Sequence, residues 1–182
     1  MSKESTKAYI SDYLKNNFIA YDDKLADESF VMEFHGSRSP DSKLECSLHF
    51  RESGLDALVY YGENASRMIS QQQDLSKLYR IINYINATLC PCPYDGMGGE
   101  LYEPSYLFNP VLYLTEDGQN DLTFYVNIDY DLFDIAPLEA CDFITAAMPE
   151  LLDELTVPIF GALLGLTEMD IAFNMVNKIL DE

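Results

Sequence analysis

The sequence predicts an α+β fold in which an antiparallel sheet of about five strands packs against helices, in the order αβββαββα with an extra C-terminal helix. Five segments alternate between apolar and polar residues, with the period of two that is typical of half-buried strands. Segments with helical periodicity precede, separate and follow them. No linker rich in proline, glycine or serine divides the chain, so we expect a single domain over residues 1–182.

The first half of the chain predicts one helix and three strands. Residues 5–17 form the expected helix, whose apolar side chains recur at helical spacing: Ile10, Tyr13, Leu14 and Phe18. Residues 29–36, 44–51 and 56–62 alternate as strands, and the short turns between them indicate an antiparallel meander. The second of these strands shows the pattern most cleanly, with inward-facing Leu44, Cys46, Leu48 and Phe50.

The middle of the chain predicts a helix over 74–89, because its apolar residues fall on one helical face. Two further strands follow at 107–114 and 121–133. The dipeptide Asp117-Gly118 between them is a hairpin signal. The segment 90–106, which is dense in turn residues at its start, is expected to be a loop within the domain.

The C-terminal part predicts helices. Pro137 suits a first helical turn, and the apolar stripe after it continues to Ile159. Pro149 and Pro158 should kink or split this helix. A last helix over 167–181 begins where Thr167 and Asp170 resemble a capping box.

The order of elements and two short segments resemble the bacterial YbjN-like family, whose fold is shared with type III secretion chaperones. The segments are Asn83-Tyr84-Ile85-Asn86-Ala87 at the end of the middle helix and FYVNIDYD at 124–131, before an acidic helix. The match covers residues 8 to about 165. The resemblance implies an α+β fold, a dimer and a non-enzymatic, chaperone-like or regulatory role, and it carries over no catalytic residue.

Charge is the most unusual feature of the composition. The chain has 11 basic and 31 acidic residues, a formal net charge of −20. Residues 81–182 hold 1 basic and 18 acidic residues, a balance of −17. Such a surface repels phosphates, so we expect neither nucleic acid nor an anionic membrane as a partner. No apolar stretch resembles a secretory signal or a spanning helix, which predicts a cytoplasmic protein.

One polar pattern is a candidate metal site. Asn127, Asp129 and Asp131 alternate along the strand predicted at 121–133, which places their side chains on one face. Calcium and magnesium prefer oxygen ligands, so these residues are candidate metal ligands. Side chains in such a row lie ~7 Å apart, however, which one small ion does not span unaided, so a solvated strand face is the favoured interpretation.

Other residues of catalytic type form no recognisable motif. His35 and His49 fall at outward strand positions, and the sequence contains no nucleophile elbow and no phosphate-binding glycine loop. Cys90 and Cys92 form a CxC pair, but no second ligand pair has a similar spacing. We therefore assign no catalytic residue and no cofactor.

The longest apolar run is VPIFGALLGL at 157–166. A surface helix normally carries polar residues opposite its apolar stripe, whereas this one is apolar all round. Either neighbouring elements bury it within the chain, or it forms a patch for a partner or a second copy. The candidate partner-binding residues are Val157, Ile159, Phe160, Leu163 and Leu164.

Three functions follow from these observations. The favoured one is a non-enzymatic acidic binding module, a chaperone-like or regulatory adaptor that holds a protein or peptide partner. Charge complementarity favours a basic partner, and we expect the protein to form a homodimer. The first alternative is a divalent-cation-dependent enzyme or sensor that uses Asn127, Asp129 and Asp131. The second is an acidic mimic of nucleic acid.

Overall fold

A computed structural model describes residues 1–24, 28–89, 108–115 and 118–180. Its centre is a six-stranded antiparallel sheet in the order β1-β2-β3-β4-β6-β5. The strands are β1 (Asp22–Lys24), β2 (Ser29–His35), β3 (Lys43–Phe50), β4 (Gly54–Tyr61), β5 (Val111–Leu114) and β6 (Leu122–Asp129). The helices are α1 (Lys3–Asn16), α2 (Glu63–Ser70), α3 (Ser76–Leu89), α4 (Tyr130–Ile135), α5 (Pro137–Asp142), α6 (Met148–Leu163) and α7 (Met169–Leu180). The predicted α+β class is confirmed, with one strand more than expected.

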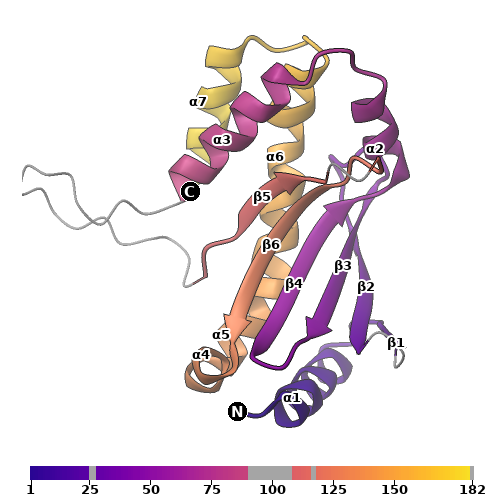
Figure 1. The fold of residues 1–182 in the computed structure, drawn as a ribbon, viewed down its shortest axis with the longest axis vertical. Helices are drawn as coiled ribbons and strands as arrows, with labels where there is room; N and C mark the ends of the chain where they lie inside the picture. The colour runs from indigo at the N-terminus through magenta and orange to yellow at the C-terminus, as the bar shows by residue number, and fades with distance from the viewer. Residues whose placement is uncertain (25–27, 90–107, 116–117, 181–182) are drawn as a thin grey trace, which may run out of the picture.

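The main helices cover one face of the sheet. In Figure 1, α6 runs behind β5 and β6, and α3 and α7 lie beside its upper end. At the lower end α1 buries Ile10 and Leu14, and the Lys7 ammonium lies 5.0 Å from the centre of the Phe30 ring. The core side chains that alternation predicted for β3 are all buried on this face: Leu44, Cys46, Leu48 and Phe50.

Two predicted strand boundaries were wrong. The strand predicted at 107–114 begins only at Val111, as β5. Helix α1 ends at Asn16, close to the predicted end, but Phe18, at a positive φ of 57°, turns its side chain into solvent instead of continuing the apolar stripe. Strand β6 ends at Asp129, because the Asp129 carboxylate accepts the backbone N–H of Asp131 at 2.7 Å and starts helix α4. The strand predicted at 121–133 was therefore too long.

The long helix predicted after Pro137 is irregular, as expected, and its irregularity has a specific form. Helix α5 leads into a π-helical segment, Phe143–Ala147, which is followed directly by α6. Pro149 lies in the first turn of α6. Proline has no backbone N–H, so one hydrogen bond of the regular helical pattern is missing there, and the wider π turn accommodates this gap. Pro158 lies inside α6 without ending it.

Strand β1, helix α2 and helix α4 were not predicted, and three predictions fall on residues outside the described ranges. The expected 90–106 loop, the Cys90/Cys92 pair and Asp117 of the predicted hairpin are not described, although β5 and β6 pair antiparallel. Within the described ranges, no helix is long and apolar enough to cross a membrane.

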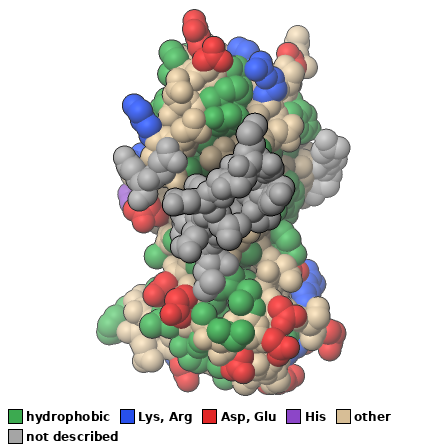
Figure 2. Space-filling view, turned by 90° about the vertical axis from the view of Figure 1, so that its left-hand side faces the viewer, with side chains coloured by type: hydrophobic (Ala, Val, Ile, Leu, Met, Phe, Trp, Pro, Cys, Tyr) green, Lys and Arg blue, Asp and Glu red, His purple; other side chains and the backbone are tan. Residues whose placement is uncertain are grey.

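Acidic side chains spread over the surface around the helices at the lower end. Figure 2 shows Asp and Glu side chains over the lower half of the face it presents, where α4 and α5 lie, interspersed with apolar ones. Asp131, Asp134, Glu139 and Asp142 of α4 and α5 are exposed, so part of the charge imbalance of the second half of the sequence reaches the surface.

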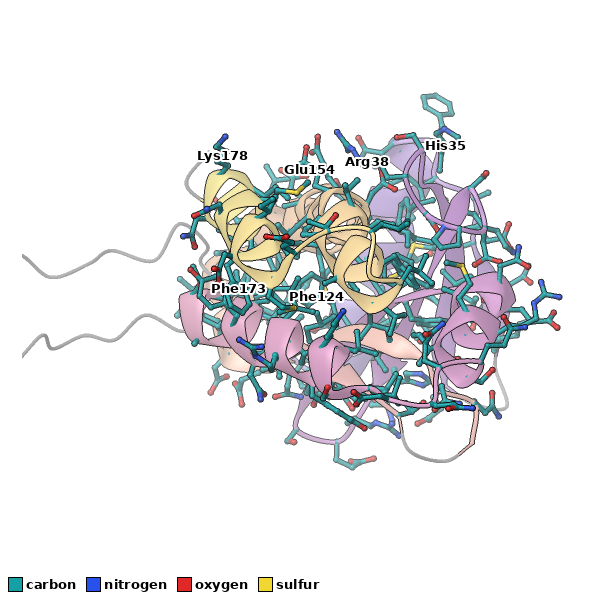
Figure 3. The ribbon with its side chains drawn as sticks, turned by 90° about the horizontal axis from the view of Figure 1, so that it is seen from above. His35, Arg38, Phe124, Glu154, Phe173 and Lys178 are labelled. Atoms are coloured by element: carbon teal, nitrogen blue, oxygen red, sulfur yellow. The ribbon has the colours of Figure 1, made fainter. Side chains whose placement is uncertain are left out.

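One buried carboxylate ties the β2–β3 turn to α6. Asp153 Oδ1 accepts the backbone N–H groups of Arg38 at 2.9 Å and Ser39 at 3.0 Å. Its Oδ2 accepts the Ser37 hydroxyl at 3.1 Å and lies 3.5 Å from the Arg38 guanidinium. Arg38 also lies beside Glu154, at 3.6 Å, as Figure 3 shows from above. This contact fixes the upper end of the sheet against the helical layer.

Candidate functional site: the open face of the sheet

We call the sheet face opposite the helices the open face. Side chains alternate between the two faces of a strand, so the register identifies its members. Strands β2, β3, β4, β5 and β6 contribute Val31, Glu33, Glu45, Ser47, His49, Asp56, Leu58, Tyr60, Val111, Tyr113, Thr123, Tyr125 and Asn127. The larger of these side chains are half-buried or exposed, in contrast to the buried side chains of the helix-covered face.

An apolar row crosses the middle of the open face. The residues paired side by side along it are Val31, Ser47, Leu58, Tyr125 and Val111. Ser47 is buried between its larger neighbours, while Val31, Leu58 and Tyr125 are half-buried and Val111 is exposed. The row is a strip of aliphatic and aromatic surface on a hydrogen-bonded sheet, which gives it a fixed shape.

A polar network borders one side of this row. Asp56 accepts the Tyr125 hydroxyl and the Asn127 side-chain amide, each at 2.8 Å, and the Arg51 Nε–H at 2.9 Å. Burial alone would raise the pKa of Asp56, but the hydrogen bonds from Asn127, Arg51 and Tyr125 outweigh it, and the pKa lies below the usual value. Burial, followed by the hydrogen bond to Asp56, raises the pKa of Tyr125. The ring of Tyr125 is thereby held in one position in the row.

Carboxylates and tyrosines border the row on its other side. The paired residues are Glu33, Glu45, Tyr60, Thr123 and Tyr113. A hollow of about 300 Å³ lies at this border, and its lining includes Glu45, Tyr60, Glu63 and Asp121. Burial and then the nearby negative charge of Glu45 raise the pKa of Tyr60. The border therefore combines aromatic surface with negative potential.

A second hollow lies at the β5 end of the apolar row. It has a volume of about 260 Å³, and Val111, Tyr125 and Asn127 line it together with Phe108 and Leu132. The apolar row thus ends in a depression with largely apolar walls. An open face of this kind supports binding of a surface-covering partner rather than enclosure of a small substrate.

Comparisons with family models, with curated proteins and with solved structures found no match to this chain. The geometry of the open face is therefore the main basis for a functional proposal.

The candidate metal ligands do not form the row that their spacing predicted. Asn127 and Asp129 belong to β6, whereas Asp131 lies in α4, because the strand predicted at 121–133 ends at Asp129. The Asn127 amide is bonded to Asp56, and the Asp129 carboxylate caps α4. Among the residues with described positions, no group of three or more His, Cys, Asp or Glu side chains is placed to hold a metal ion.

The structure places most of the predicted partner-binding residues in the core. Ile159, Phe160 and Leu163 are at most 5% exposed, so for these three residues the structure shows the other alternative, burial within the chain. Helices α3 and α7 pack on α6, and Tyr61 meets Phe160 edge-to-face at 5.3 Å. Val157 and Leu164 are 45% and 39% exposed and remain accessible. Helix α6 is therefore apolar around most of its circumference because neighbouring elements cover it on several sides.

Sequence reasoning missed the open face as a candidate site. The alternation of the segment 56–62 contained a signal for it, since Asp56, Leu58 and Tyr60 share one face of that strand. Of the two predicted surface histidines, His49 lies on the open face beside Asp56, and His35 is exposed at the end of β2.

Proposed function

We propose that this protein is a non-enzymatic cytoplasmic binding module that holds a protein or peptide partner on the open face, in a chaperone-like or regulatory role. The apolar row centred on Leu58 and Tyr125 carries this proposal. Covering apolar surface is favourable by about 25 cal/mol per Å², and a rigid sheet loses little conformational freedom when a partner binds. The resemblance to the YbjN-like family implies the same class of role and a homodimer.

The proposal is tested with partners that co-purify with the tagged protein. Leu58→Arg places a charge in the middle of the apolar row, and Ile171→Arg places the same charge at an exposed position on α7. We expect Leu58→Arg to abolish retention of a specific partner and Ile171→Arg to leave it unchanged. Hydrogen–deuterium exchange of the purified complex should show protection of β3, β4 and β6.

The two variants are compared only after circular dichroism confirms that both fold like the wild type. Retention of every partner by Leu58→Arg would show that the open face is not the binding surface. Equal loss with both variants would show that charge at any position disrupts binding.

A further inference from the structure

The open face places negative charge at a defined distance from its apolar row. Tyr60 follows Leu58 by two positions on β4, so the two side chains point to the same side about 7 Å apart. Glu45 is the direct β3 neighbour of Tyr60, and Glu63 and Asp121 line the same hollow. The apolar row therefore has a carboxylate-lined hollow one side-chain repeat away.

The negative charge of this hollow is only partly compensated. Lys43 pairs with both Glu33 and Glu45, the latter at 3.2 Å. Asp121 accepts the Ser66 hydroxyl at 2.8 Å, which leaves its charge in place. In the described part of the chain, neither Asp121 nor Glu63 forms an ion pair. The chain as a whole adds its net charge of −20 to this local field.

Resting on the function proposed above, we infer that the partner docks a basic segment on the open face. An apolar side chain of that segment covers Leu58 and Tyr125, and a lysine or arginine two positions away enters the hollow beside Tyr60. Alternate side chains of an extended segment lie about 7 Å apart, which matches the spacing of Leu58 and Tyr60. The carboxylates and the phenol ring both attract a cation, whereas a second copy of this acidic chain would bring like charges together.

The test uses synthetic labelled peptides that differ at one repeated position. Repeats of Leu-Ser-Arg-Ser are compared with repeats of Leu-Ser-Gln-Ser, Leu-Ser-Glu-Ser and Ser-Ser-Arg-Ser, by fluorescence anisotropy at low and physiological ionic strength. We expect the first peptide to bind most tightly, and added salt to weaken it.

Two variants with equal charge changes localise the binding. Glu45→Gln combined with Asp121→Asn removes two negative charges from the hollow, and Glu168→Gln combined with Asp170→Asn removes two exposed charges before and in α7. Two lost surface charge pairs predict binding weakened about three- to tenfold for the first variant. The second variant should bind the peptide like the wild type.

The outcomes separate this inference from the function on which it rests. If the arginine, glutamine and glutamate peptides bind equally and the Leu58→Ser variant loses this binding, the inference of a basic partner is overturned. The open face would then remain the binding surface. Equal weakening by the two charge variants would overturn the docking in the hollow. Binding of the arginine peptides regardless of leucine and of Leu58, or no binding at all, would overturn both.

Discussion

Replacement of Asp153 by alanine should destabilise the protein, because its buried carboxylate ties the β2–β3 turn to α6. Its Oδ1 accepts two backbone N–H groups of the β2–β3 turn, those of Arg38 and Ser39. Alanine leaves both donors without this acceptor. Ser39 is buried, so its N–H does not reach water easily, whereas the neighbouring Arg38 is more exposed.

The expected loss follows from these two donors. A buried donor left unsatisfied costs about 1–3 kcal/mol, and partial access to water reduces the second cost, so the free energy of unfolding should fall by about 2–4 kcal/mol. Asp153→Asn keeps an oxygen at Oδ1 and loses mainly the Ser37 and Arg38 side-chain contacts of Oδ2. It should therefore cost only about 1–2 kcal/mol.

Urea denaturation measures both values. With a slope of about 2 kcal/mol per molar, the midpoint should fall by about 1–2 M for Asp153→Ala. Glu154→Ala is the matched control, because it removes the next carboxylate, whose ion pair among the described residues is with the exposed Arg38 side chain. It should change the free energy of unfolding by less than about 1 kcal/mol. A loss for Asp153→Ala no larger than for Asp153→Asn or Glu154→Ala would refute the assignment of the stabilisation to the two backbone donors.

Three further predictions concern other parts of the fold. The Asn86 side chain donates to and accepts from the backbone of edge-strand residue Leu112, both at 2.8 Å, so Asn86→Ala should lower the free energy of unfolding by about 1–3 kcal/mol and speed exchange of the Leu112 amide, as measured by NMR. The lowered pKa of Asp56 stabilises the folded protein fully above about pH 4, and this contribution is lost as the pH falls through the folded-state pKa. Below about pH 4, the free energy of unfolding of Asp56→Asn should therefore fall less than that of the wild type, as measured by urea titration. Phe160→Ala should cost about 3–5 kcal/mol because Phe160 is buried, whereas Leu164→Ala should cost far less, and equal melting temperatures would contradict this.

The sequence predicted the elements that carry their own pattern. In β3, every second residue from Leu44 to Leu48 is apolar and buried, and this period of two is enough to predict a strand. Strand β1 consists of the exposed residues Asp22–Lys24 and becomes a strand only by pairing with β2. The N-cap residue of helix α2 provides no side-chain cap, and Asp41 from the β2–β3 turn instead accepts the N–H groups of Asn64 and Ala65. Neither the pairing of β1 with β2 nor the capping of α2 by Asp41 can be recognised from the local sequence.

The candidate site was only partly predictable for the same reason. Alternation places Leu58 and Tyr60 together on one face, but which face the helices leave open depends on the path of the whole chain. The apolar run in α6 was ambiguous because burial by α3 and α7 and exposure to a partner require the same composition. Asp129 had two compatible roles, strand residue and helix cap, and only the position of α4 decides between them.

The turn between β2 and β3 also has a consequence for the order of folding. Asp41 on this turn caps α2, and a Cβ at Gly62 would lie 2.8 Å from the Asp41 carboxyl carbon, so a side chain there would displace this cap. The same turn is anchored to Asp153, more than a hundred residues later in the chain. Closing the short β2–β3 loop loses less chain entropy than closing that long one. We therefore expect the β2–β3 hairpin and its contact with α2 to form before α6 docks on the turn through Asp153.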